Sequence, residues 1–145
     1  MNNNLDVICQ MVLSKKPDIS NLHLQKLLYY IQVLSLVLLN ETAFENKIEA
    51  WTYGPVVPDA YFKMKNGVYN QNLSKSNKKI SSDLKTIVDS IVDNLGKKAP
   101  FELVNMTHSY DTWIDAWKNL SDKTINHEKI KKYHKNRLEE EGTVF

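Results

Sequence analysis

Apolar residues recur at helical spacing along most of the chain. The first such set shares one face of a helix near the start: Leu5, Ile8, Cys9, Val12 and Leu13. A second helix is expected to run to about Leu39 from Ser20 or Asn21, either of which can cap it. This helix is apolar around most of its circumference, so other elements must enclose it on all sides. The pattern therefore predicts that the second helix is the centre of the fold.

The rest of the chain predicts further helices and one short strand. Helical spacing, proline at first helical positions and glycine after a last one indicate helices over about 58–64, 84–95, 100–107, 110–119 and from 124 or 126 to about 141. Near residues 47–53 the apolar period falls to two, which indicates a strand that Gly54 and Pro55 should end. Residues 70–82 are rich in Asn, Ser and Lys and should form an exposed, mobile connection.

These elements predict a mainly α fold, a single compact domain of six or seven helices around a buried central helix, with a short β element near residues 47–53. The domain should span residues 5–140, leaving a C-terminal tail at 141–145. A chain of 145 residues, 42% hydrophobic and 25% charged, has the ordinary balance of one domain. Cys9 is the single cysteine, which excludes an intrachain disulfide framework and a Cys-rich zinc site. Its place on the apolar face indicates core packing.

The start of the chain and its most apolar stretch bear on location. Met1 is followed by three asparagines, not by the basic region and apolar run of a secretory signal. The most apolar stretch, residues 27–39, is 13 residues long. A helix needs roughly 18 to 20 residues to span a bilayer. We therefore expect a cytoplasmic protein without a membrane segment.

Histidines are the main candidates for chemistry. His108, Ser109 and Asp111 supply acid–base residue types, but no nucleophile elbow, metal-binding histidine pair or phosphate-binding glycine loop accompanies them. His108 is expected instead to satisfy backbone carbonyls at a helix end. His127 and His134 lie seven residues apart on the last helix, about 10 Å and too far for one metal, and are expected at the surface. We therefore expect a protein that is not an enzyme and that holds neither a metal nor a cofactor. A small hydrolase that uses His108 is the alternative.

Charge is nearly balanced over the chain and uneven along it. The net charge of +2 excludes a global polyelectrolyte made to coat nucleic acid. From Lys123 to Arg137, however, six cations stand against Glu128 alone. The candidate nucleic-acid contacts there are Lys129, Lys131, Lys132 and Lys135. Because these positions spread around the helix and acidic residues 139–141 follow, a solvated charged face is the commoner explanation.

Three segments carry a resemblance to a known family. The first is LQKLLYY at residues 24–30 and the second is EAWTYGPVVPDAY at 49–61. The third runs from Leu103 through Thr107 and His108 to Trp113. In this order and spacing they resemble the Panacea domain family, which includes phage-associated GepA-like proteins and SocA-like adaptors. Two positions depart from the family pattern, since Tyr110 stands where Glu is usual and Thr112 where Pro is usual.

The resemblance implies a bacterial or prophage antitoxin domain. Such a domain binds and neutralises a toxin encoded beside it, and different members pair with unrelated toxins. SocA-like members are instead adaptors that deliver a toxin to a Clp-type protease. An adaptor needs a second contact, for which residues 70–82 or the charged tail are candidates. Neither role requires the domain to make or break bonds.

The matched segments also predict where a partner would bind. Lys26 and Tyr29 of the central helix, Glu49 and Trp51 of the strand, and His108 and Trp113 of the helix junction can converge in one polar-aromatic cluster. We expect a Lys26–Glu49 ion pair in it, and the cluster can be functional or structural. Aromatic side chains concentrate binding energy at the centres of interfaces. The exposed residues expected to meet a toxin are Tyr29, Tyr30, Trp51, Tyr53 and Tyr61.

Overall fold

The central apolar segment forms the helix around which the others are arranged. In the computed structural model, which describes residues 4–70 and 79–145, this helix is α2 (Asn21–Leu34), and it continues as a π-helical turn (Ser35–Leu39). The Ser20 side chain accepts a hydrogen bond from the His23 amide, so the predicted cap is confirmed. Every side chain from His23 to Val33 is buried. The prediction of a buried central helix is therefore confirmed.

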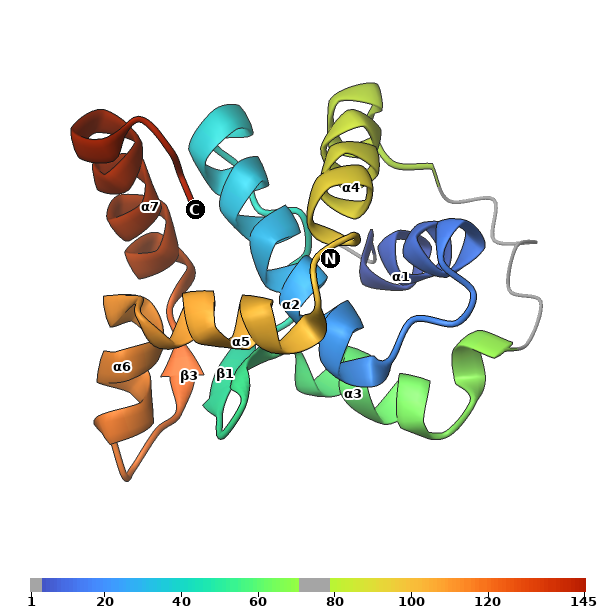
Figure 1. Ribbon diagram of the computed structural model, residues 1–145, viewed down its shortest axis with the longest axis horizontal. Helices are drawn as coiled ribbons and strands as arrows, with labels where there is room; N and C mark the ends of the chain where they lie inside the picture. Colours follow the sequence, from blue (N-terminus) through green and yellow to red (C-terminus); the bar gives the residue numbers. More distant parts are fainter. Residues whose placement is uncertain (1–3, 71–78) are drawn as a thin grey trace.

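Within the described residues, six further α-helices surround α2. Figure 1 shows α2 standing between α7 (His127–Glu141) and α4 (Ser82–Leu95), with α1 (Asn4–Lys15) beyond α4. The remaining helices lie beneath them: α3 (Pro58–Lys65), α5 (Pro100–His108) and α6 (Asp111–Lys118). A short 3-10 helix (Val68–Asn70) follows α3. Over the described residues the fold is thus mainly α, as the apolar spacing predicts.

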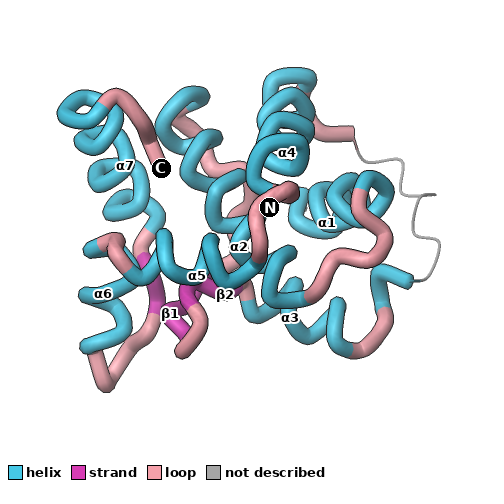
Figure 2. Tube along the Cα trace, in the orientation of Figure 1, coloured by secondary structure: helices cyan, strands magenta, loops and turns pink. Residues whose placement is uncertain are grey.

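A small antiparallel sheet lies under the helices, where Figure 2 shows the strands. Its order is β2 (Gly54–Val56), β1 (Ile48–Trp51), β3 (Thr124–Ile125). The expectation that Gly54 and Pro55 end the strand is wrong, because the chain turns at residues 52–53 and returns. Gly54 has φ +103°, which only glycine adopts readily, and Pro55 lacks an amide hydrogen and so suits an edge strand. The two residues of β3 are too few to show a period in the sequence.

The long helical segment that contains α2 also satisfies the length and composition of a membrane span. It covers Asn21–Leu39, 19 residues, and is the one such segment among the described residues. However, 72% of this window is buried inside the domain. The segment is therefore accounted for as the core helix of the fold.

The C-terminal residues fold back onto the core. Glu141 is the last residue of α7, and Gly142 ends the helix with a left-handed conformation. Val144 is buried, and the Phe145 ring lies 5.3 Å from the Tyr30 ring, edge to face. In Figure 1 the C-terminus lies between α7 and α2. The residues expected as a tail, 141–145, thus belong partly to α7 and partly to the packing around α2. Residues 71–78 of the expected connection lie outside the described residues.

Cys9 lies in the core, as its position on the apolar face of α1 predicts. Its side chain is fully buried, and burial raises the pKa of the thiol to about 12. Because the thiolate is the reactive form, we expect native protein to react with a disulfide reagent at least 100-fold more slowly than protein unfolded in guanidinium. Release of the coloured thiolate from Ellman's reagent measures both rates. Similar rates in the two states would show that Cys9 is accessible.

Candidate functional site

Helix α2 supplies the hydrogen-bond partners for the outer edge of the sheet. Strand β2 has β1 on one side, and its other side faces α2. There the Lys26 amine donates to the Pro55 carbonyl, and Gln25 Oε1 accepts from the Val57 amide at 2.9 Å. Backbone groups of an edge strand that find no partner are costly when buried. Two adjacent polar side chains of α2 thus complete the edge of β2 and of the residue that follows it.

The turn of the β1–β2 hairpin is held from the opposite side by α5 and α6. His108 Nε2 lies 3.0 Å from the Thr52 carbonyl, and Trp113 Nε1 donates to the Trp51 carbonyl at 2.9 Å. Because a carbonyl only accepts, His108 must carry a proton on Nε2. The His108 and Trp113 rings lie 4.2 Å apart. His108 thus bonds to a backbone carbonyl, as expected, but that carbonyl belongs to the hairpin and not to a helix end.

Thr107 completes this arrangement above the hairpin glycine. A methyl group at Gly54 would lie 2.6 Å from Thr107 Oγ1, closer than real contacts allow. We call the five side chains that hold the hairpin the hairpin clamp: Gln25, Lys26, Thr107, His108 and Trp113. The three sequence segments that carry the resemblance therefore meet at the backbone of the β1–β2 hairpin.

Lys26 does not form the expected ion pair with Glu49. The Glu49 carboxylate instead lies 3.2 Å from Lys47 Nζ and accepts from Trp51 Nε1 at 3.0 Å. That prediction is wrong because the Lys26 side chain ends at the backbone of β2, whereas Glu49 lies on β1. The Lys26 side chain is fully buried, and desolvation lowers the pKa of its amine to about 7.

An aromatic groove of about 670 Å³ opens beside the clamped hairpin. Its walls come from α2, the hairpin, α3, α5 and α6. The residues that line the aromatic groove are Asn21, Leu22, Gln25, Ala50, Trp51, Thr52, Tyr53, Val56, Tyr61, Phe101 and Trp117. Three of its rings are notably exposed: Tyr53 at 55%, Phe101 at 58% and Trp117 at 38%. Large exposed aromatic side chains gathered in a concave surface are typical of binding sites.

The groove brings together three of the five predicted contact aromatics. Trp51 packs on Tyr61 with ring centroids 5.0 Å apart, and Tyr53 packs on Phe101 at 5.8 Å. The pattern did not single out Phe101 or Trp117 as contacts. For Phe101 the only available signal is an aromatic residue that follows Pro100 at the exposed start of a helix. Trp117 stacks on Trp113 at 5.3 Å, as their i, i+4 spacing predicts.

Tyr29 and Tyr30 are not exposed, contrary to expectation. Both are fully buried, and their hydroxyl groups bond inside the protein instead of pointing to water. Tyr29 Oη lies 2.7 Å from Thr112 Oγ1, and Tyr30 Oη lies 2.9 Å from Tyr110 Oη. The two positions that depart from the family pattern thus supply partners to α2. Because α2 is enclosed on all sides, its tyrosines serve the core and not the surface.

His134 is likewise buried, although it was expected at the surface. Its Nε2 lies 2.8 Å from the Tyr29 hydroxyl and its Nδ1 lies 2.5 Å from the Val144 carbonyl. Burial is the main reason that the pKa of His134 falls to about 4. With the proton on Nδ1, this ring donates to the C-terminal segment and accepts from Tyr29. Within residues 4–70 and 79–145, no group of three or more His, Cys, Asp or Glu side chains could hold a metal ion.

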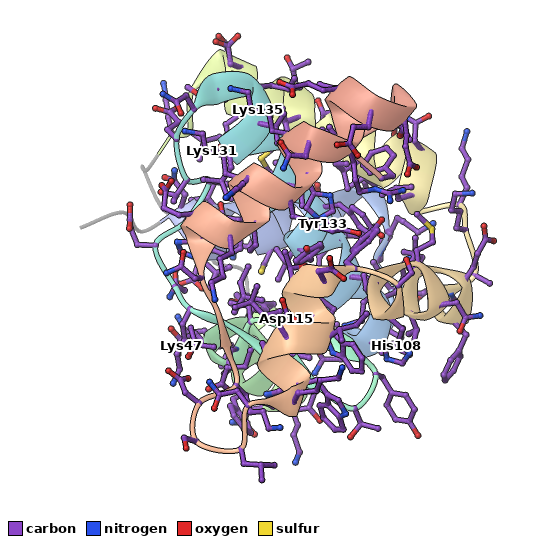
Figure 3. All side chains as sticks on the ribbon, turned by 90° about the vertical axis from the view of Figure 1, so that its left-hand side faces the viewer. Lys47, His108, Asp115, Lys131, Tyr133 and Lys135 are labelled. Atoms are coloured by element: carbon purple, nitrogen blue, oxygen red, sulfur yellow. The ribbon has the colours of Figure 1, made fainter. Side chains whose placement is uncertain are left out.

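The basic residues of α7 do not form one face. In Figure 3, Lys131 and Lys135 lie along one side of the helix, while Tyr133 lies between α7 and α6. Lys129 and Lys132 line a separate cleft with Tyr133, opposite Asp111 and Asp115 of α6. A phosphate backbone entering that cleft would meet two carboxylates as well as two amines. The four candidate nucleic-acid contacts are therefore divided between two environments.

Comparison with known protein families gives a match to an antitoxin-like family. The model of the family described as "Antitoxin SocA-like, Panacea domain" matches residues 24–114, more than half of the chain. The matched range contains every residue of the hairpin clamp, the hairpin itself and Phe101. Comparisons with curated proteins and with solved structures give no match.

Proposed function

Because the chain belongs to the antitoxin SocA-like, Panacea domain family, we propose that it neutralises a toxin encoded by a neighbouring gene by binding it directly. The observation that carries the proposal is the aromatic groove, whose exposed rings lie on and beside a hairpin that the matched segments form and hold. Aromatic side chains in a concave surface supply large contact area at low conformational cost. The partner surface is thus Trp51, Tyr53, Tyr61, Phe101 and Trp117.

A role as a binding domain also accounts for the surroundings of His108. Among the described residues, His108 Nε2 donates to the Thr52 carbonyl, and the Ser109 hydroxyl donates to the Met106 carbonyl. General-base activation of a nucleophile requires the two groups to lie within roughly 3.2 Å of each other. The His108 and Ser109 side chains bond to backbone carbonyls instead. We accordingly propose a cytoplasmic, non-enzymatic protein of bacterial or prophage origin.

Growth rescue tests this proposal. Cells that express the adjacent reading frame should stop growing, and co-expression of this protein should restore growth and yield a complex that co-purifies. Tyr53→Ala and Phe101→Ala should each weaken binding at least tenfold, because each removes an exposed ring from the groove. Leu38→Ala is the matched control, since Leu38 is 59% exposed but lies at the far end of the helix that contains α2. Equal loss of rescue in the control would remove the groove from consideration.

The same experiment separates blocking from delivery. If rescue depends on a Clp-type protease and the toxin disappears from the cells, the protein is an adaptor. If rescue persists without the protease, the protein blocks its toxin by binding alone. Absence of toxicity or of rescue would contradict the proposal and favour the DNA-binding alternative through Lys129, Lys131, Lys132 and Lys135. In that case DNA affinity should fall steeply with salt, by about 0.9 in log K per phosphate contact per log salt.

A further inference from the structure

Lys26 is an unusual residue in the core of this domain. Lysine is rarely fully buried, because its amine loses strong hydration. Among the described residues, the one hydrogen-bond partner of this amine is the Pro55 carbonyl, and no carboxylate forms an ion pair with it. A methionine or leucine would fill the same apolar space without that cost. The position of the amine therefore needs an explanation beyond packing.

The surroundings of the amine point to the hairpin. A methyl group at Gly54 would lie 3.0 Å from Lys26 Cε and 3.3 Å from Nζ, so the lysine chain runs directly against the backbone where β2 begins. The side chain spans from α2 to this strand, where it makes its hydrogen bond to the Pro55 carbonyl. Lys26 thus ends on the backbone that the aromatic groove is built around.

The hairpin needs such support. Strand β1 has four residues and β2 has three, and an isolated two-stranded hairpin is at best marginally stable in water. The neighbour β3 adds only two residues, on the far side of β1. On the open side of β2, Lys26 and Gln25 take the place of a missing strand. Trp51 and Tyr53, which line the groove, belong to this hairpin.

We propose that Lys26 is a positioning residue for the aromatic groove. Its hydrogen bond to the Pro55 carbonyl fixes the hairpin in the place that gives the groove its shape, so Lys26 controls partner binding without touching the partner. This inference rests on the proposed function, since it assigns a role at the same site. The state of the hairpin can nevertheless be measured without any partner.

Lys26→Met tests the proposal, because methionine keeps most of the volume and cannot donate a hydrogen bond. The amides of Trp51, Gly54, Val56 and Val57 should exchange with deuterium at least tenfold faster than in the wild type, while amides of α4 change little. The three tryptophans, Trp51, Trp113 and Trp117, all lie at this site, so the indole N–H signals in NMR spectra report on it directly. The Trp51 and Trp113 signals should shift. Affinity for the adjacent gene product should fall at least tenfold.

Val88→Ala is the matched control. Val88 is fully buried on α4 and removed from the hairpin, so this variant loses stability through a core cavity alone. It should leave the indole signals and the relative rate of deuterium exchange of the hairpin amides unchanged. Lys26→Gln keeps an N–H donor on a shorter side chain and should recover part of the hairpin protection. If Lys26→Met does not fold, Lys26→Gln and the wild type still decide the question.

In the wild type, the amides of Trp51, Gly54, Val56 and Val57, which lie at paired positions of the hairpin or bond to Gln25, should be protected well above the level of frayed helix ends. Protection at the level of frayed ends would overturn the proposal. So would a folded Lys26→Met with unchanged hairpin exchange, or a Val88→Ala that loosens the hairpin equally. If the adjacent gene product binds neither the wild type nor any variant, the proposed function fails, and the exchange data still decide whether Lys26 positions the hairpin. If it binds Lys26→Met as tightly as the wild type although the hairpin is loosened, control of binding by Lys26 is disproved.

Discussion

Gly54→Ala should lower the free energy of unfolding by about 3 kcal/mol, through two effects that add. Gly54 has φ +103°, a conformation in which a side chain is strained. The added methyl group would also lie 2.6 Å from Thr107 Oγ1 and 3.0 Å from Lys26 Cε. Thr107 is fully buried and donates to the Val104 carbonyl, so it has no free space to move into. Urea denaturation followed by circular dichroism measures the change.

Gly142→Ala is the control for this experiment. Gly142 also has a positive φ, +75°, but no atom lies within 4 Å of the position of an added methyl group. Its substitution should therefore cost only the backbone strain, about 1 kcal/mol. The difference between the two variants isolates the contact with the clamp. Equal losses would mean that Thr107 and Lys26 do not confine Gly54, and the close-packed clamp would be disproved.

Acid should destabilise the protein through His134, by about 3 kcal/mol between pH 6.5 and pH 4. The pKa of this histidine is about 4 in the folded state, against an ordinary value of 6.5. Between these values the unfolded chain takes up a proton that the folded chain cannot accept. The contribution of neutral His134 to the free energy of unfolding is thus complete above pH 6.5 and is lost as the pH falls toward 4. Arg137 reinforces the effect because its positive charge also opposes protonation.

The main physical cause is burial of the ring, which disfavours its charged form, and both ring nitrogens already have a partner. His134 Nδ1 bonds to the Val144 carbonyl, and Nε2 is occupied by the Tyr29 hydroxyl. His134→Gln should be less stable than the wild type at pH 7.5, and the stabilities of the two proteins should converge as the pH approaches 4. His127→Gln is the control, since it removes a half-buried histidine from the same helix and keeps His134. Parallel stability curves for the wild type and His134→Gln would contradict the assigned role.

His23 makes a smaller contribution of the same sign. Burial lowers the pKa of His23, whose Nε2 donates to the Leu95 carbonyl at the end of α4. The acid sensitivity that remains in His134→Gln should therefore include His23. Carboxylates that titrate below pH 5 affect both proteins alike, so the comparison of the two proteins removes them.

Much of the fold could be predicted because the periodicity of a helix is visible in a short stretch of sequence. Apolar residues at i, i+3 and i+4 identify α4, and the Ser20 and Asn126 side chains cap α2 and α7 as their positions predict. The strand β1 was also predicted from its period of two. In contrast, β2 and β3 have three and two residues, and such short strands exist only because β1 lies between them. Their hydrogen bonds are invisible in a local pattern.

The candidate site divides in the same way. Lys26, Trp51, His108 and Trp113 were predicted to converge in one cluster, and they meet at the hairpin. Tyr29 and Tyr30 were assigned to the surface because an aromatic ring with a hydroxyl group suits either environment. Their place was decided by Thr112, His134 and Tyr110, which lie 80 or more residues away in the chain. Only packing brings such partners within reach.

The amino-acid sequence by itself determined the helices, the buried central helix, the family and the identity of the matched segments. The tertiary structure alone decided what the polar side chains do. Lys26 meets the Pro55 carbonyl and not Glu49, and His134 joins the core and not the surface. The physical reason is that periodicity records which face of an element is buried, whereas a hydrogen bond depends on which groups the packed elements bring within about 3 Å of each other.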